Sequence, residues 1–196
     1  MGQIAAPFLR TVSGGGALLE CMRQSHMAGC LADPSPGLKC NWGKQHMFEP
    51  EELRADIRER RIPATPDVVY AAFSNPDRLA KWWGPEGFSN TFEAFDLRPG
   101  GHWRFTMHGP DGRDYWNESV FVEVLPARRV IIEHGAGHHF LLTISYTQDG
   151  QDTIVGWRQV FDTAAHYRKI AGFVARANEQ NLDRMSAEVL HSVASA

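Results

Sequence analysis

The chain has 196 residues, of which 43% are hydrophobic and 22% are charged. This length and composition suit one globular domain with a tail, and they exclude collagen and a wholly disordered chain. Twenty Lys and Arg against 23 Asp and Glu give a net charge of −3, so neither nucleic acid nor a membrane is an expected partner. Six Trp in a chain of this length favour either a large core or a ligand cavity lined with aromatic rings.

Residues 1–46 differ from the rest of the chain. They hold all three cysteines and seven glycines and show no sustained hydrophobic period, so we predict a poorly structured N-terminal extension. The cysteine spacing fits no zinc motif, and an odd count makes a poor disulfide framework. Neither a transmembrane helix nor a signal peptide is recognisable, and we expect a cytoplasmic location. Met47 is an alternative start, and it opens a domain that we place at residues 47–196.

The pattern after Met47 predicts one strand and then two short helices. A half-buried strand is expected over 53–62, where charged residues alternate with Leu53, Ala55 and Ile57. Thr65, followed by a proline, is typical of a helix start. The Asn-Pro pair at 75–76 ends that helix and begins a second one over 77–83.

From residue 90 onward, a period of two predicts a series of antiparallel strands separated by turns rich in Gly, Pro and Asp. We expect these strands at 91–97, 102–108, 115–125, 129–134, 139–147 and 153–161. An amphipathic helix is expected over 164–190. The predicted fold class is therefore α+β, with a curved antiparallel sheet of about six to seven strands wrapped around one long C-terminal helix.

Several stretches resemble a known superfamily. They are PDVVYAAFSNP at 66–76, LAKWWGP at 79–85, RPGGHW at 98–103 and EVLP at 123–126. Together they are similar to the START/Bet v 1-like (SRPBCC) superfamily, in the branch related to the C-terminal domain of the Hsp90 ATPase activator Aha1. The resemblance covers about residues 53–190. It implies a helix-grip fold with a central cavity for small apolar or amphipathic molecules.

The same resemblance sets limits on function. The eukaryotic activator has a separate N-terminal domain that engages Hsp90, and residues 1–46 are too short to supply it, so Hsp90 activation is not implied. The chain also departs from the usual pattern of the branch at two places. It has Asn-Glu-Ser at 117–119, where a glycine is common, and His134, where a threonine is common.

Strand alternation places three polar side chains on apolar faces. Glu118 shares a face with Trp116, and His134 and Arg158 likewise share faces with apolar neighbours. Three interpretations stay open: a structural Glu118–Arg158 ion pair, orientation of a ligand's polar group, and acid/base catalysis by Glu118 or His134. A register error of one residue would reverse these faces.

Aromatic rings and helix amides supply further candidates. Trp82 and Trp83 end the second short helix, where one ring either fills the core or forms a lid over a cavity with Phe88. Asn178 and Asn181 fall near the apolar stripe of the last helix, where an amide either faces a ligand or lies beside solvent. The predicted ligand-binding residues are Trp82, Trp83, Phe88, Trp103, Trp116, Glu118, His134, Arg158 and Asn178.

The sequence predicts no metal site and no cofactor. Five of the nine histidines lie between residues 102 and 139, but three of them flank a Gly-rich loop that is a poor platform for metal ligands. No nucleophile motif and no phosphate-binding glycine loop is present.

Three hypotheses for function follow. The first is a domain that binds a small apolar or amphipathic molecule, in a bacterial-type stress or metabolism protein. The second is an enzyme of the cyclase, hydrolase or isomerase kind that acts on a hydrophobic substrate in the same cavity. The third is a chaperone-associated module that binds a protein partner, for which the charged run at 58–61 offers a surface. A homodimer is an assembly that the sequence leaves open.

Overall fold

The computed structural model describes residues 49–195, and the extension predicted for residues 1–46 lies outside them. The first elements are a short 3-10 helix η1 (Glu51–Leu53), strand β1 (Ala55–Ile62) and helices α2 (Pro66–Ser74) and α3 (Pro76–Trp82). The strands that follow are β2 (Ser89–Phe95), β3 (His102–His108), β4 (Asp114–Leu125), β5 (Arg129–His134), β6 (Phe140–Asp149) and β7 (Asp152–Phe161). Helix α4 (Ala164–Ala194) is the last element.

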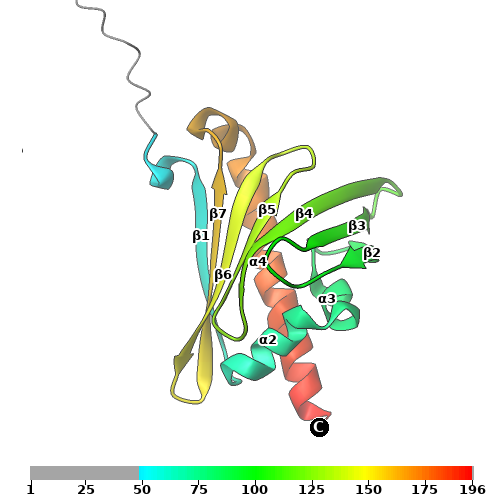
Figure 1. Cartoon of the computed structure of the whole chain (residues 1–196), viewed down its shortest axis with the longest axis vertical. Coiled ribbons are helices and arrows are strands. Elements are labelled where there is room, and N and C mark those ends of the chain that lie inside the picture. Colours follow the sequence, from blue (N-terminus) through cyan, green and yellow to red (C-terminus); the bar gives the residue numbers. More distant parts are fainter. Residues whose placement is uncertain (1–48, 196) are drawn as a thin grey trace, which may run out of the picture. The chain divides into compact units, whose positions relative to one another are not determined.

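The seven strands form one sheet in the order β1-β7-β6-β5-β4-β3-β2. Every neighbouring pair is antiparallel. Figure 1 shows the sheet curving around α4, with α2 and α3 covering one end of the same face. This arrangement confirms the predicted α+β class and the helix-grip fold.

The starts of the two short helices follow from different local contacts. Asn75 caps α3, because its side-chain oxygen accepts hydrogen bonds from the backbone N–H groups of Asp77 at 2.9 Å and Arg78 at 3.1 Å. Thr65 precedes α2, as predicted, but its side chain makes no capping hydrogen bond. The proline at the first position of α2 supports the start instead, because its fixed φ already suits a helix.

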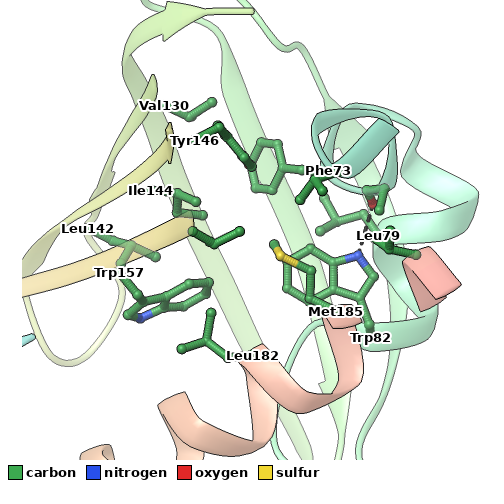
Figure 2. Close-up of a cluster of buried hydrophobic side chains, with 14 of the residues drawn as sticks. Phe73, Leu79, Trp82, Val130, Leu142, Ile144, Tyr146, Trp157, Leu182 and Met185 are labelled. Carbon is green, nitrogen blue, oxygen red and sulfur yellow. Dashed lines mark hydrogen bonds between the residues drawn. The ribbon is translucent and has the colours of Figure 1, made fainter. Parts of the chain in front are cut away.

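The core lies between the concave face of the sheet and the helices (Figure 2). Trp82 is 1% exposed, and its indole N–H donates to the carbonyl of Ala72 at 2.9 Å. Trp103 is also 1% exposed and stacks on Phe105, with ring centroids 4.6 Å apart. Phe73 of α2 packs against both Trp82 and Trp103. Two of the predicted ligand-binding residues, Trp82 and Trp103, are therefore core residues.

Strand β1 turns the opposite face inward from the one that was predicted. Leu53 and Ile57 are 56% and 59% exposed, whereas Asp56 is 4% exposed. Asp56 and Arg58 face α4, which supplies amide and carboxylate partners for them. The prediction of a buried stripe was therefore wrong for Leu53 and Ile57, whereas Ala55 is buried as predicted. From Asp56 onward, the face with hydrogen-bonding partners on α4 turns inward.

Candidate functional site

A cavity of about 690 Å³ opens on the concave side of the sheet, beside α4. This volume is typical of pockets that hold small organic ligands. Much of its wall is apolar, and the apolar lining includes Trp83, Phe105, Met107, Ile132, Leu142 and Trp157. The polar lining includes Asn117, Ser119, His134, Gln159, Asn178 and Asn181. Among the lining residues that the structure describes there is no Lys or Arg.

The cavity brings together five of the nine predicted ligand-binding residues. They are Trp83, Phe88, Trp116, His134 and Asn178. The other four lie elsewhere: Trp82 and Trp103 in the core, and Glu118 and Arg158 on the opposite face of the sheet. Trp82 therefore fills the core, as the first interpretation of the tryptophan pair states, whereas Trp83 lines the cavity and packs on Trp103 and Trp157. The lid with Phe88 stays a prediction.

Strand β4 turns Glu118 to the outer face of the sheet. Its inward side chains are Asn117 and Ser119, and a register shift between Phe121 and Glu123 interrupts the alternation. Of the apolar residues that alternate with Glu118, only Val124 follows this shift and packs against the core, so the inward side chain of Val124 does not place Glu118 inside. The face predicted for this side chain was wrong.

The predicted Glu118–Arg158 ion pair is also absent from the described residues. The nearest basic partner of Glu118 is His102, with Nδ1 3.6 Å from a carboxylate oxygen. Arg158 pairs with Glu51 of η1. Both side chains are partly exposed, so neither is the buried charge that would have needed a partner inside the cavity.

The mouth of the cavity carries large aromatic side chains. Phe88 and Tyr115 pack against each other, with ring centroids 6.0 Å apart. Trp116 of β4 is 52% exposed, and Phe173 of α4 is 62% exposed. Both line the cavity, so apolar surface continues from the rim into the interior.

His134 is held by contacts on its face and on both ring nitrogens. Its ring stacks on Phe140, while Nδ1 lies 2.9 Å from the carbonyl oxygen of His138 and Nε2 lies 3.1 Å from the side-chain amide of Asn117. Burial lowers the pKa of His134, because an apolar setting disfavours the charged ring. At neutral pH the imidazole is therefore uncharged, and both of its nitrogens already face protein atoms.

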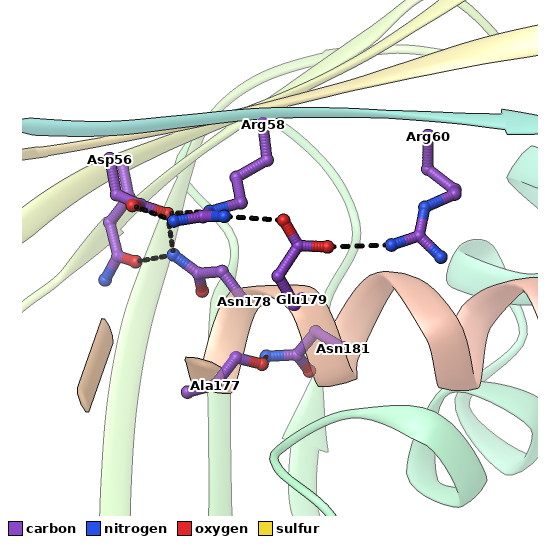
Figure 3. Close-up of polar contacts among 8 residues, drawn as sticks. Asp56, Arg58, Arg60, Ala177, Asn178, Glu179 and Asn181 are labelled. Carbon is purple, nitrogen blue, oxygen red and sulfur yellow. Dashed lines mark hydrogen bonds and ion pairs between the residues drawn. The ribbon is translucent and has the colours of Figure 1, made fainter. Parts of the chain in front are cut away.

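A chain of polar side chains stands where the cavity meets the joint between β1 and α4 (Figure 3). Asn178 donates through Nδ2 to Asp56 at 3.0 Å and to the side-chain oxygen of Gln159 at 2.8 Å. Arg58 binds Asp56 through two nitrogens, at 2.9 and 3.0 Å. Burial alone would raise the pKa of Asp56, but the hydrogen bonds from Arg58 and Asn178 outweigh it and hold that pKa below its usual range.

Asn181 is engaged within the protein in a different way. Its side-chain oxygen accepts from the backbone N–H of Gly84 at 2.7 Å, and its Nδ2 donates to the carbonyl of Ala177 at 3.1 Å. Asn181 therefore joins α4 to the turn after α3. Of the two helix amides, Asn178 is the one with an atom left for a ligand.

Three of the five clustered histidines, His102, His108 and His139, contact carboxylates on the described surface. His139 lies between Glu133 and Asp162, and these two carboxylates raise the pKa of its imidazole. His108 contacts Asp114 at the cavity mouth. Within residues 49–195, no three His, Cys, Asp or Glu side chains converge as metal ligands would.

The chain matches one protein-family model. Residues 63–189 match the model described as "Activator of Hsp90 ATPase homolog 1-like protein". The match extends over more than half of the chain. The chain belongs to this family. A comparison with curated proteins found no match.

Solved structures similar to this member of the family show the same fold. A crystal structure from Nitrosomonas europaea has a TM-score of 0.67 at 17% identity, covering 73% of this chain and 98% of that chain. A solution structure from Arthrobacter aurescens has a TM-score of 0.67 at 19% identity, covering 73% and 90%. A solution structure of an AHSA1-like protein from Aeromonas hydrophila has a TM-score of 0.57 at 20% identity, covering 70% and 93%.

Sequence reasoning missed three of the polar residues that distinguish this cavity: Asn117, Ser119 and Gln159. A signal for two of them was present, because 117–119 and His134 are the places where the sequence departs from the usual pattern of the family branch. Gln159 gave no such signal. The prediction that Arg158 faces the cavity placed its neighbour Gln159 on the outer face of the sheet.

In the part of the chain that the structure describes, no helix is both long enough and apolar enough to span a membrane.

Proposed function

We propose that this domain binds a small apolar or amphipathic molecule in the cavity beside α4. One observation carries the proposal: a space of about 690 Å³ with a largely apolar wall, a few neutral polar side chains such as Asn178 and Gln159, and one carboxylate, Asp114. Protein interiors are otherwise close-packed, and empty apolar volume costs free energy. A ligand that fills the space and hydrogen-bonds the polar side chains offsets that cost.

The other two hypotheses have less support. Catalysis needs an acid or base that is available to a substrate. Glu118 lies on the outer face, and both ring nitrogens of His134 face protein atoms. A partner-binding surface at 58–61 is also weakened, because Arg58 and Arg60 turn toward α4 and pair with Glu179.

We further expect the protein to act in the cytoplasm and to take no cofactor. Both expectations rest on the sequence, in which no cysteine follows residue 40 and no cofactor motif occurs. Cell fractionation with an antibody to the native protein tests the first. A homodimer is a further possibility for the assembly, and sedimentation equilibrium would measure the oligomeric state.

A neutral fluorescent probe tests the binding proposal. N-phenyl-1-naphthylamine gains fluorescence in apolar surroundings and is smaller than the cavity. We expect saturable binding to the full chain, and we expect Ala177→Trp to abolish it, because Ala177 lines the cavity and the new ring would occupy that space. Ala175→Trp is the matched control, since Ala175 is on the same helix and is not a lining residue. Equal binding by both variants would contradict the proposal.

A further inference from the structure

The hydrogen bonds of Asp56 fix the orientation of two amides in the cavity wall. Asp56 is ionised, because its pKa lies below the usual range, and an ionised carboxylate can only accept hydrogen bonds. The atom of Asn178 that lies 3.0 Å from Asp56 must therefore be its amide nitrogen. Figure 3 shows Asn178 reaching from α4 toward Asp56.

The orientation of the Asn178 amide in turn fixes the orientation of the Gln159 amide. The same nitrogen of Asn178 lies 2.8 Å from Gln159, so the facing atom of Gln159 must be its acceptor oxygen. This leaves two atoms without a protein partner among the described residues: Nε2 of Gln159, a donor, and Oδ1 of Asn178, an acceptor. Neither belongs to the fully enclosed side-chain atoms that lack a partner, and both residues line the cavity.

We propose that the cavity selects a ligand whose polar head is uncharged and combines an acceptor with a donor, and that Asp56 acts as the positioning residue for this choice. A primary carboxamide is the simplest such group. Its oxygen accepts from Nε2 of Gln159 while its N–H donates to Oδ1 of Asn178. This inference rests on the proposed function and adds the chemical class of the ligand.

An anionic head is excluded by the same residues. No Lys or Arg is among the described lining residues, so a buried carboxylate would have no cation to offset its loss of water. Arg58 is the nearest candidate in this network, but Asp56 and Glu179 already occupy its guanidinium. It is also not a lining residue. A carboxylate would further face the acceptor oxygen of Asn178.

Three naphthalene derivatives of similar size test the selection at pH 7.5: 2-naphthamide, 2-naphthoate and 2-methylnaphthalene. Each is measured by its displacement of N-phenyl-1-naphthylamine from the full chain. We expect 2-naphthamide to bind at least roughly tenfold more tightly than either of the others, since two net hydrogen bonds of ordinary strength give a factor of that order. Equal affinities, or tightest binding of 2-naphthoate, would overturn the inference.

Two variants examine the role of Asp56. In Asp56→Asn, either the oxygen or the nitrogen of the new amide can face Asn178. The side-chain amides of Asn178 and Gln159 are then no longer held in a single orientation. We expect the preference for 2-naphthamide to fall to within about threefold, with the affinity for 2-methylnaphthalene unchanged. Asp183→Asn is the matched control, because it removes an ion pair to Arg60 at the same joint of β1 and α4 and leaves Asp56 intact. A preference that survives in Asp56→Asn would overturn the positioning role.

A third variant keeps the inference testable if Asp56→Asn does not fold. Gln159→Glu has almost the same shape but replaces the donor with an acceptor, so it should remove the preference for 2-naphthamide. The outcomes also separate the two proposals. Failure of all three compounds to displace the probe from the wild-type protein would contradict the proposed function itself. Displacement without selectivity would contradict only the inference about the ligand.

Discussion

The ring of His134 lies flat on the ring of Phe140, with centroids 4.5 Å apart and planes 3° from parallel. Both residues line the cavity, and the stack is at the junction of β5 and β6. The stack buries the imidazole, and that burial is the main cause of its lowered pKa. The same contact therefore shapes the cavity wall and makes the fold sensitive to acid.

This lowered pKa predicts how stability depends on pH. The folded-state pKa of His134 lies below the unfolded value of about 6.5, so protonation favours the unfolded chain. Its contribution is present in full above the unfolded pKa and is lost as pH falls through the folded pKa. We expect the free energy of unfolding, measured in urea from pH 7.5 to 5, to fall less steeply in His134→Gln than in wild type.

His139 provides the control for that experiment, because its pKa is shifted in the opposite direction. Glu133 and Asp162 raise it, so its contribution is present below the unfolded pKa and is lost as pH rises through the folded pKa. His139→Asn should therefore steepen the loss of stability toward acid. A change of the same sign in both variants would contradict these assignments.

We expect Trp82 to contribute substantially to the free energy of unfolding, and we expect Trp116 to contribute little. Trp82→Phe removes the hydrogen bond to the carbonyl of Ala72 and part of a fully packed ring. We expect a loss of about 2–3 kcal/mol in the free energy of unfolding. Trp116→Phe, at a side chain that is 52% exposed, should change it by less than about 0.5 kcal/mol. Urea denaturation followed by circular dichroism measures both, and equal losses would show that the core is misassigned.

Gly101 is predicted to be intolerant of any side chain. A Cβ at this position would lie 1.9 Å from the backbone oxygen of Asp96, whereas one at Gly135 would have no atom within 4 Å. Gly101→Ala should therefore destabilise the fold by at least about 2 kcal/mol, and Gly135→Ala should stay within about 0.5 kcal/mol of wild type. Similar thermal midpoints for the two variants would contradict the close approach at Gly101.

The fold was predictable because its signals are local. Asn75 marks the break between two helices, and the turn at 109–112 separates β3 from β4, as their sequences indicate. The cavity was predictable only in part, because the face a strand turns inward depends on contacts distant in sequence. Asp56 is buried because Asn178, more than a hundred residues away, binds it. The irregularity after Phe121 leaves no mark in the alternating pattern.

Methionine methyl NMR tests the central claim, that a small apolar molecule binds inside the cavity, most directly. Met107 lines the cavity, whereas Met185 is buried in the core and is not a lining residue. The two signals are assigned with Met107→Leu and Met185→Leu. When N-phenyl-1-naphthylamine is titrated into the full chain labelled at its methionine methyl groups, we expect a saturable shift of the Met107 signal and a much smaller shift at Met185. A Met107 signal that does not move up to the solubility limit of the probe would contradict the account.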